Sequence, residues 1–363
     1  MSAVTYENDI TPVASPEAKP DDIERSGELV QALIEVFAQV LGVSAIFADS
    51  DFFELGGDSI LAMALAIEIQ ESCRMTVPAT LLFDAPTPAA LAQAMGERAA
   101  SQPGPLVLLK EGGQEPPVFL VPGVTGSPIE FQSFTRFADI PNPIYGLQTP
   151  GLDGRQQPLR DIYDMVAYFL PSIRARQPHG PYLLGGNSMG GFTALELGCM
   201  LVGAGETVAL LALFDTLITR KHLSLGQRLA VWRQRARHHA AAAKNRPLQY
   251  AASYVGGRWH GRKSKPLPEH WTLVPWRGLQ DVVAGAREAA VSYRPRYYPG
   301  TITFFAATDD ADWPIYPEIT WRRLAKKLEV RRINGDHTSL FRARAADTAG
   351  QFAGLVRSAL DTE

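Results

Sequence analysis

A serine, a histidine and an aspartate at well-separated positions could together perform nucleophilic acyl transfer in this chain. Ser188 lies in Gly186-Asn187-Ser188-Met189-Gly190, a Gly-x-Ser-x-Gly motif that is typical of a strained strand-to-helix turn with an exposed serine hydroxyl. Such a nucleophile needs a base that takes its proton, an acid that orients the base, and amide donors for the oxyanion. His337, which follows the last apolar run of the chain, is the candidate base.

The other histidines are weaker candidates for the base. His179 precedes the serine motif, whereas the usual order along such a chain is serine, then acid, then histidine. The remaining five lie in a segment without a strand pattern, where solvated or packed side chains are expected: His222, His238, His239, His260 and His270.

Two positions are open for the acid that orients the histidine. Asp215 directly follows the apolar run Val208–Phe214, one run after the serine motif. The later run Ile302–Ala306 is followed by three further aspartates, where many serine hydrolases place their acid: Asp309, Asp310 and Asp312. The residues alone do not choose between the two positions.

A second serine stands in a different motif nearer the N-terminus. In Gly56-Gly57-Asp58-Ser59, two glycines precede a serine at the predicted start of a helix, and the tight turn presents its hydroxyl. The unpaired amides and the dipole of that helix end favour a phosphate on Ser59. The same tetrapeptide could also be a turn and an N-cap and nothing more.

Composition and charge restrict the class of protein. The chain has 363 residues, 46% of them hydrophobic, and a formal net charge of −3, which is typical of a globular protein with room for two domains. Its two cysteines, Cys73 and Cys199, give neither a disulfide framework nor zinc-ligand spacing, so we expect no metal and a reducing cytoplasm. The first twenty residues lack an export signal, and no run of about 18 apolar residues predicts a membrane span.

Helical periodicity dominates the first hundred residues. Residues 1–24 are polar and contain prolines, and we expect them to be disordered. A helix is predicted from Ser26 to Gly42, a second near Ser59, and a third from Thr87-Pro88 that ends before Gly96. The second is apolar at every position from residue 60 to 67, so part of it is expected to face partners, the alternative being core throughout.

Strand patterns begin after residues 98–105, a predicted linker of charged and small residues with proline and glycine. Helical stretches such as Asp161–Arg176 and Met189–Gly203 separate several short apolar runs. This alternation predicts a largely parallel sheet with helices on both faces. The predicted strands are Leu106–Leu109, Val118–Val121, Ile144–Leu147, Tyr182–Leu184, Val208–Phe214, Ile302–Ala306 and Leu328–Ile333.

The N-terminal motifs resemble a known family. Asp51-Phe52-Phe53-Glu54-Leu55-Gly56-Gly57-Asp58-Ser59, with a helix before it and Phe83-Asp84-Ala85-Pro86-Thr87 after it, is similar to the peptidyl or aryl carrier domains of nonribosomal peptide synthetases over about residues 25–97. The resemblance implies a small all-α helical bundle with covalent 4′-phosphopantetheine on Ser59. It also implies a phosphopantetheinyl transferase as a partner.

The C-terminal motifs resemble the product-releasing type I thioesterase domains of peptide and polyketide synthetases, over residues 106–363. The resemblance implies an α/β-hydrolase fold, a helical lid at about residues 217–295, and Ser188, Asp215 and His337 as the catalytic triad. It also implies an oxyanion hole formed by the amides of Val124 and Met189. Asn187 stands where the family more usually has histidine, tryptophan or tyrosine, which bears on acyl-chain selectivity rather than on the triad. The motifs are Val118–Gly123, Gly186–Gly190, Phe214-Asp215, Tyr293–Pro295 with Tyr298–Gly300, and Gly335–His337.

Charge is distributed unequally between the two predicted domains. Residues 20–99 hold thirteen acidic residues against three arginines, whereas residues 220–265 hold twelve basic residues and no acidic one. Opposite electrostatic fields on two tethered domains would raise the frequency of productive encounters between them. The alternative is that the basic residues form a solvated helix face without such a role. Nucleic-acid binding is not expected, because the acidic bundle would oppose it. The basic residues are Arg220, Lys221, Arg228, Arg233, Arg235, Arg237, Lys244, Arg246, Arg258, Arg262, Lys263 and Lys265.

Together the two resemblances imply a carrier–thioesterase didomain of natural-product biosynthesis. It would accept an acyl or peptidyl thioester on phosphopantetheine, transfer it to Ser188, and release it by hydrolysis, macrocyclisation or carbon–carbon condensation. Its partners would be upstream adenylation, condensation or ketosynthase domains, and the chain would be a free-standing terminal protein or the end of a larger synthetase. The alternative is a stand-alone serine esterase or acyltransferase with a helical docking module, which needs no group on Ser59.

Overall fold

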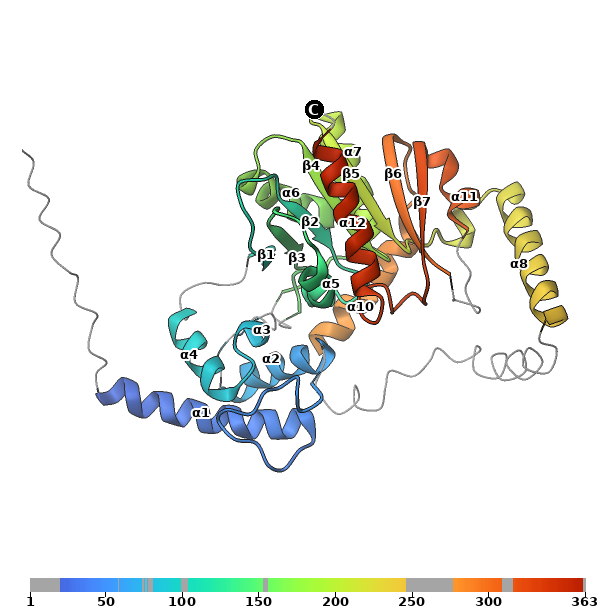
Figure 1. The fold of residues 1–363 in the computed structure, drawn as a ribbon. Helices are drawn as coiled ribbons and strands as arrows, with labels where there is room; N and C mark the ends of the chain where they lie inside the picture. Colours follow the sequence, from blue (N-terminus) through green and yellow to red (C-terminus); the bar gives the residue numbers. More distant parts are fainter. Residues whose placement is uncertain are drawn as a thin grey trace, which may run out of the picture. The chain divides into compact units, whose positions relative to one another are not determined.

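The computed structural model describes residues 20–57, 59–73, 75, 77, 81–98, 104–152, 156–245, 277–308 and 316–361. The chain divides into two compact units, residues 1–77 with 81–101 and residues 78–80 with 102–363. Figure 1 labels the helices and strands of both units. None of the helices in the described ranges combines the length and the apolarity that a membrane crossing needs.

Four helices make up the described part of the first unit. Leu33, Phe37, Phe52 and Leu65 are buried in this unit, and the rings of Phe37 and Phe52 meet edge to face at 5.6 Å. This small core agrees with the predicted helical bundle. The helices are α1 (Pro20–Leu41), α2 (Ser59–Cys73), α3 (Leu81–Asp84) and α4 (Pro88–Arg98).

The ends of these helices agree with the sequence prediction at two places and differ from it at two. Gly42 ends α1 with a φ of 68°, and Thr87 caps α4 by accepting a hydrogen bond from the Ala90 amide at 3.2 Å. The predicted disorder of residues 20–24 is wrong, because α1 begins at Pro20, whose fixed φ suits a first helical turn; residues 1–19 lie outside the described ranges. The predicted end before Gly96 is also wrong, since one glycine costs a helix only about 1 kcal/mol and α4 continues to residue 98.

The apolar face of α2 packs inside the unit where its side chains are described. Ala62, Ala64 and Ala66 are buried, and Leu61 and Ile67 are half-buried. The alternative, a core position, therefore holds for the alanines, and the expectation that part of this stretch faces partners stays a prediction. Small residues are buried here because they let neighbouring helices approach closely.

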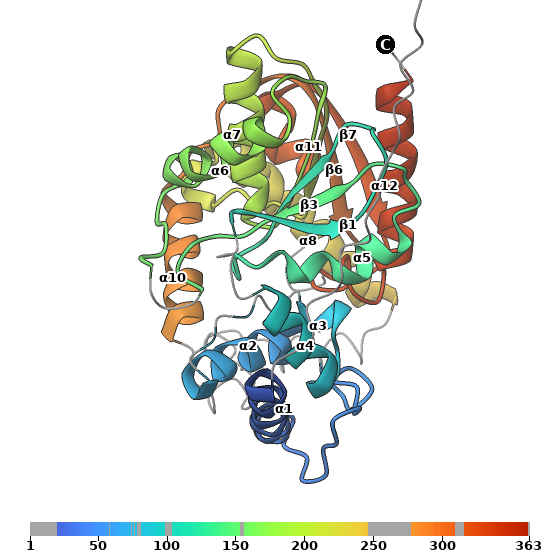
Figure 2. The same cartoon turned by 90° about the vertical axis from the view of Figure 1, so that its left-hand side faces the viewer.

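A sheet of seven strands lies at the centre of the described part of the second unit (Figure 2). The strand order is β1-β3-β2-β4-β5-β6-β7, and among these strands β1 alone runs antiparallel to its neighbour. This confirms the seven predicted strands and the largely parallel sheet. The strands are β1 (Leu106–Lys110), β2 (Val118–Val121), β3 (Ile144–Leu147), β4 (Tyr182–Asn187), β5 (Val208–Phe214), β6 (Tyr298–Ala307) and β7 (Ala325–Ile333).

Helices cover both faces of this sheet, as predicted (Figures 1 and 2). One face packs against α6 (Ile162–Arg176), α7 (Gly190–Gly203) and α10 (Arg277–Ser292). The other packs against the 3-10 helix η1 (Pro128–Phe131), α5 (Gln132–Phe137) and α12 (Ala345–Leu360). The shorter elements α11 (Pro317–Thr320) and η4 (Arg322–Leu324) precede β7.

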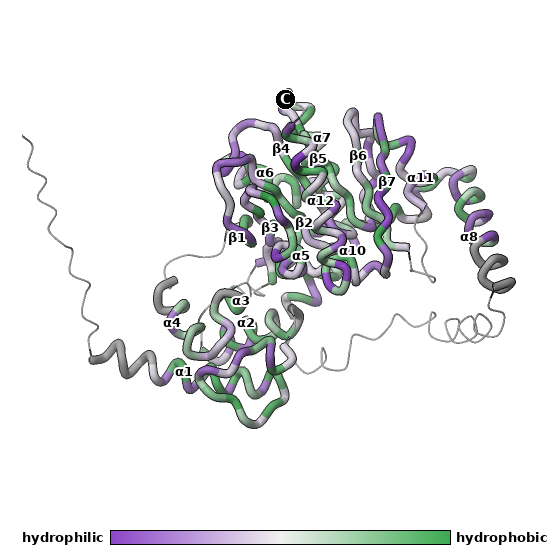
Figure 3. The backbone as a smooth tube through the Cα atoms, viewed as in Figure 1, coloured by the Kyte–Doolittle hydropathy of each residue, from purple (hydrophilic) through white to green (hydrophobic). Residues whose placement is uncertain are grey.

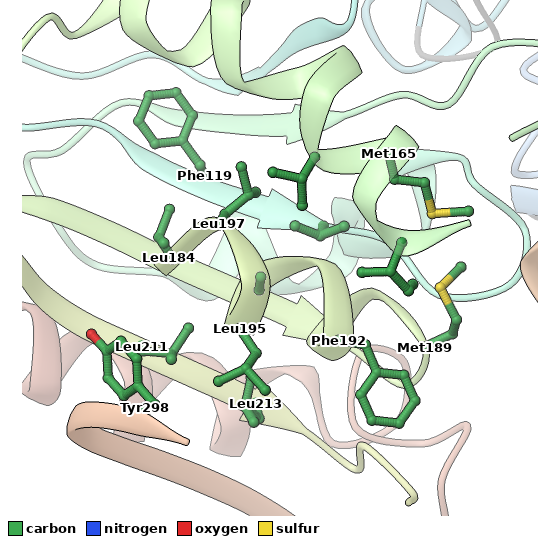
Figure 4. Close-up of a cluster of buried hydrophobic side chains, with 14 of the residues drawn as sticks. Phe119, Met165, Leu184, Met189, Phe192, Leu195, Leu197, Leu211, Leu213 and Tyr298 are labelled. Carbon is green, nitrogen blue, oxygen red and sulfur yellow. The ribbon is translucent and has the colours of Figure 1, made fainter. Parts of the chain in front are cut away.

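Each central strand contributes to two hydrophobic cores, because successive side chains point to opposite faces of a strand. On β5, Leu211 and Leu213 belong to the core beneath α6, α7 and α10, whereas Leu210, Ala212 and Phe214 belong to the core beneath α5 and α12. The residues of β5 are accordingly hydrophobic along the whole strand (Figure 3). Figure 4 draws part of the first core, where side chains of α7 meet those of the strands.

The second core contains a cluster of phenylalanines around the end of β5. The ring of Phe214 stacks on Phe305 at 4.6 Å and meets Phe341 edge to face at 4.9 Å. Phe134 and Phe352 complete the group around it. Phe214 is fully buried and immediately precedes Asp215, so this cluster fixes the backbone on which the candidate acid stands.

Replacing Phe214 by alanine is expected to destabilise the second unit by about 3–5 kcal/mol, the usual cost of a large aromatic cavity. The six tryptophans of the chain lie at or beyond residue 232, so tryptophan fluorescence during guanidinium unfolding reports this unit and not the first. Phe137→Ala is the matched control, since that ring is 54% exposed and should cost no more than about 0.5 kcal/mol. Equal losses for the two variants would contradict the packing described here.

Candidate active site

Ser188 and Asp215 follow neighbouring strands at the same edge of the sheet. In the parallel pair of β4 and β5, Asn187 is the register partner of Phe214, so Ser188 and Asp215 are the next residue on each strand. The Ser188 amide donates a hydrogen bond to the Phe214 carbonyl at 2.7 Å. The carboxyl ends of parallel strands are the edge at which sheets of this type bind ligands.

Both residues have an unusual backbone conformation. Ser188 has a φ of 51° and Asp215 a φ of 47°, and they are the only non-glycine residues with positive φ in the described ranges. Such a conformation costs about 1–3 kcal/mol at each residue and clusters at functional sites. The strain turns each side chain sharply out of the strand that precedes it.

The glycines of the serine motif are required by close backbone contacts. A Cβ on Gly186 would overlap the carbonyl of Gly190, and a Cβ on Gly190 would overlap the carbonyl oxygens of Pro122 and Val121. The strand-to-helix turn thus presses the first turn of α7 against the end of β2. Only glycine fits at these two positions.

Asp215 is fully buried and forms a hydrogen bond with His337. Its Oδ2 lies 3.2 Å from Nδ1 of His337, and its Oδ1 accepts the Ala307 amide at 2.9 Å. The Nδ1–H of the imidazole therefore points at the carboxylate, which leaves Nε2 available as a base. The side chain of His337 remains 35% exposed, so it is accessible to a substrate.

A turn after β7 presents His337. Gly335 adopts a φ of 138°, which other residues rarely adopt, and Asp336 folds the following residues back. Its Oδ1 accepts the amides of Thr338 at 3.0 Å and Ser339 at 2.9 Å. Hydrogen bonds lower the pKa of Asp336, and the bond from the Thr338 hydroxyl has the largest effect. The carboxylate is therefore ionised at neutral pH and keeps this turn intact.

The competing residues from the sequence have other positions. His179 contacts Glu206 at 3.2 Å, and Nε2 of His222 lies 3.1 Å from the Val291 carbonyl. The side chains of the other four histidines and the alternative acids are not among those the structure describes: His238, His239, His260, His270, Asp309, Asp310 and Asp312.

The loop after β2, residues 122–126, carries one of the two expected oxyanion donors, the amide of Val124. Gly126 has a φ of 65° and closes a turn by donating to the Gly123 carbonyl at 3.1 Å. Its own carbonyl accepts the amide of Thr149 at 3.0 Å. Met189, the other expected donor, precedes the first residue of α7, and the amides at a helix N-terminus have no partner within the helix.

Sequence reasoning missed a carboxylate in this region. Glu130, in η1, is partly buried, and it accepts hydrogen bonds from the Gly123 amide at 2.9 Å and from Nδ2 of Asn187 at 2.8 Å. Burial raises its pKa, against the opposing effect of these bonds and of nearby His337. A signal was present, because Glu130 is a lone acid among the buried apolar residues Pro128, Ile129 and Phe131.

The segment of the expected lid is partly described. It contains η2 (Arg220–His222), α8 (Leu225–Asn245) and α10, whereas residues 246–276, with five of the twelve basic residues, lie outside the described ranges. A pocket of about 500 Å³ opens along η2 and α8. Its lining combines three basic side chains with three apolar ones: Lys221, Arg228, Arg235, Leu223, Val231 and Trp232.

An ion pair ties the chain after α10 to the helix that follows the serine. Glu196 of α7 is fully buried; it accepts the hydroxyl of Tyr293 at 2.9 Å and pairs with the guanidinium of Arg296. Cys199, one turn further along α7, is a free thiol. Burial, with Glu196 as a second cause, raises the pKa of Cys199 to about 11.

Ser59 is the first residue of α2. The turn before it closes with a hydrogen bond from the Gly57 amide to the Phe52 carbonyl at 2.9 Å, and Gly56 has a φ of 96°. Asp51 holds the start of this turn by accepting the Phe53 amide at 2.7 Å. The serine backbone therefore stands at the N-terminus of a 15-residue helix, as predicted, while its side chain is not among those described.

Comparison with known proteins finds a matching family model for part of each unit. Residues 31–95 match the model of the phosphopantetheine attachment site, and residues 116–235 match the model of the thioesterase domain. A dimodular nonribosomal peptide synthase of Bacillus subtilis (strain 168) is 30% identical over 301 residues, which cover 80% of this chain and 12% of the synthase. Malpibaldin synthetase of Mortierella alpina is 27% identical over 321 residues, which cover 87% of this chain and 5% of the synthetase.

Among solved structures, the chain is similar to holo-AB3403, a four-domain nonribosomal peptide synthetase bound to AMP and glycine. The TM-score is 0.54 at 22% identity, and the match covers 97% of this chain and 27% of that one. At this identity the likeness concerns the fold alone. The chain spans 12% or less of the length of the two relatives above.

Gly190→Ala is expected to lower the free energy of unfolding of the second unit by about 1–3 kcal/mol, because the new Cβ must displace backbone at the end of β2. Gly203→Ala, at the other end of α7, is the matched control. Nothing lies within 4 Å of a Cβ there, so the variant should gain up to about 1 kcal/mol of helix propensity. Guanidinium unfolding followed by tryptophan fluorescence measures both, and changes of the same sign would contradict the close contact.

Proposed function

We propose that this chain, which joins a phosphopantetheine-attachment domain to a thioesterase domain, holds an acyl or peptidyl group as a thioester on Ser59 and releases it through an ester on Ser188. The observation that carries the proposal is the hydrogen bond between His337 and the buried Asp215, whose carboxylate stands one strand away from the strained serine. A fold that needed only stability would not retain strain at two adjacent strand ends together with an oriented imidazole.

Proton transfer in the proposed reaction depends on the orientation of His337. Asp215 holds Nδ1–H of the imidazole, so Nε2 takes the proton of the Ser188 hydroxyl as its oxygen attacks the thioester carbonyl. The tetrahedral intermediate collapses to an ester on Ser188, and the imidazolium returns its proton to the departing thiolate. In hydrolysis, Nε2 takes a proton from water as the water oxygen attacks the ester, and the imidazolium returns that proton to the Ser188 oxygen as the carboxylic acid leaves.

The negative charge that forms on the carbonyl oxygen needs fixed donors. The amides of Val124 and Met189 would supply them, one from the loop after β2 and one from the N-terminus of α7. Removing one such donor costs serine hydrolases about 10²–10³-fold in kcat. The relative position of these two segments therefore also affects the rate, although by a smaller factor than the triad.

The start of α2 fits a phosphodiester on Ser59. The glycine turn brings the serine to the N-terminus of a helix, whose unpaired amides and dipole stabilise a phosphate there. When bound, 4′-phosphopantetheine supplies a terminal thiol that carries the acyl group as a thioester. Attachment requires a phosphopantetheinyl transferase as a partner.

Upstream adenylation, condensation or ketosynthase domains would supply the acyl or peptidyl group. The two synthetase relatives support a place in nonribosomal peptide synthesis. Residues 20–99, with thirteen acids and three arginines, would meet the basic segment 220–265 during transfer. Release by water, by an internal nucleophile in macrocyclisation, or by carbon–carbon condensation all proceed from the same ester on Ser188.

The two serines should fail in different ways when they are replaced. Ser188→Ala should leave the acyl group on a chain loaded from acyl coenzyme A by a transferase, because loading needs only Ser59. Ser59→Ala should not load at all, yet it should cleave a soluble acyl thioester at the parent rate. Intact-protein mass spectrometry over time measures both; loading of Ser59→Ala, or release from Ser188→Ala at the parent rate, would remove the assigned serine from the scheme.

Asp215→Asn should reduce cleavage of a soluble acyl thioester by on the order of 10³–10⁴-fold, because an amide no longer fixes the Nδ1–H tautomer or steadies the imidazolium. Asp310→Asn, at the alternative acid position, is the control and should change the rate by less than about threefold. The double variant Asp215→Asn/His337→Ala should lose far less activity than the product of the losses in the two single variants. A larger loss for Asp310→Asn would move the acid to the segment after β6.

A further inference from the structure

The carboxylate of Glu130 connects two segments that carry the proposed oxyanion donors. Oε1 accepts both the Gly123 amide at 2.9 Å and Nδ2 of Asn187 at 2.8 Å. Oε2 accepts the hydroxyl of Thr125 at 3.2 Å. One side chain therefore holds the loop after β2 on both sides of Val124, and it holds the residue that immediately precedes Ser188.

The connection lies directly beside the nucleophile. A Cβ on Gly123 would lie 3.5 Å from the Cβ of Ser188 and 3.5 Å from Nδ2 of Asn187, so the loop passes close enough to the serine that one added methyl group would touch it. At this separation a small displacement of the loop moves the Val124 amide relative to the Met189 amide. Hydrogen-bond donors act on an oxyanion only within about 2.7–3.1 Å.

The strands themselves do not need this connection. The pairing of β2 with β4 already runs through Val121 and Gly186, which are register partners at the ends of the two strands. Glu130 acts beyond that point, where the ladder has ended. The far end of the loop has its own anchor, the hydrogen bond from Thr149 to the carbonyl of Gly126.

We propose that Glu130 is a positioning residue that locks the loop of residues 122–126 to Asn187, so that the amides of Val124 and Met189 converge on one oxygen. The proposal rests on the proposed function, because it presupposes that Ser188 is the nucleophile. Burial raises the pKa of Glu130, and the three hydrogen bonds that its carboxylate accepts act in the opposite direction.

The test uses the full chain and a fluorophosphonate, whose phosphoryl oxygen occupies the oxyanion position when the reagent bonds to the nucleophilic serine. This probe needs no knowledge of the natural acyl group. The variants are Glu130→Ala, which removes all three acceptor contacts, and Glu130→Gln, which keeps an acceptor for Gly123 and Asn187 and a donor for the Thr125 oxygen. Glu111→Ala, at an exposed carboxylate of the same unit, is the control.

Glu130→Ala should slow phosphonylation by about 10–100-fold, somewhat less than the loss of a whole oxyanion donor. With a soluble acyl thioester, kcat should fall by a similar factor while KM stays within about twofold, because the donors act on the transition state more than on the bound substrate. Glu130→Gln should recover to within about threefold of the parent in both assays. Glu111→Ala should match the parent.

Three outcomes would overturn the proposal. If Glu130→Gln reacts as slowly as Glu130→Ala, with a shifted pH profile, Glu130 acts electrostatically on His337 instead. A rise in KM at constant kcat would assign it to substrate binding. Parent rates in a folded Glu130→Ala would leave it no role. Failure of the proposed function looks different, because the parent and Ser188→Ala would then be labelled alike.

Discussion

The pairing of β4 with β5 determines where Ser188 and Asp215 stand in the candidate site. Asn187 and Phe214 are partners in this parallel register, and each strand ends one residue before a strained turn. A shift by one residue would turn Phe214 out of its aromatic core and move Asp215 away from His337. The packing of the second core and the geometry of the site therefore depend on one register.

The hydrogen bonds around Asp215 show how this edge is held. The carboxylate is fixed to the neighbouring strand β6 through the Ala307 amide, and its backbone amide donates to the Phe305 carbonyl at 2.9 Å. One residue later, the Thr216 carbonyl accepts the indole N–H of the buried Trp321 at 3.0 Å. The acid is thus oriented before any substrate arrives, which is what a preorganised catalytic group requires.

Much of this arrangement was predictable from the sequence because local patterns determine it. Short apolar runs specified all seven strands, and glycine spacing specified the strained serine turn, since both depend on nearest neighbours along the chain. The choice between Asp215 and the aspartates at 309–312 required the family resemblance, because it depends on which strands become neighbours. The bonds of Glu130 bring together residues 57 positions apart, and no local pattern encodes such a contact.

The extents of the helices were harder to predict than their existence. α1 starts at Pro20 and α4 runs past Gly96, in both cases through residues whose local preference is only a weak guide. The family motif around Tyr293 illustrates the converse. In the sequence this motif is only part of a resemblance. In the structure the hydroxyl of Tyr293 donates a hydrogen bond to the buried carboxylate of Glu196.

The raised pKa of Cys199 has a consequence for a protein that handles thioesters. A thiolate within reach of an activated acyl group would compete with the serine by thiol exchange, and only the ionised form attacks. With a pKa of about 11, Cys199 is ionised in about one molecule in 10⁴ at pH 7, although it stands on the same helix that follows Ser188. Burial likewise raises the pKa of Cys73, on the helix that begins with Ser59. In the proposed reaction, Cys199 would therefore compete poorly with Ser188 for the acyl group, and the raised pKa of Cys73 would act in the same direction.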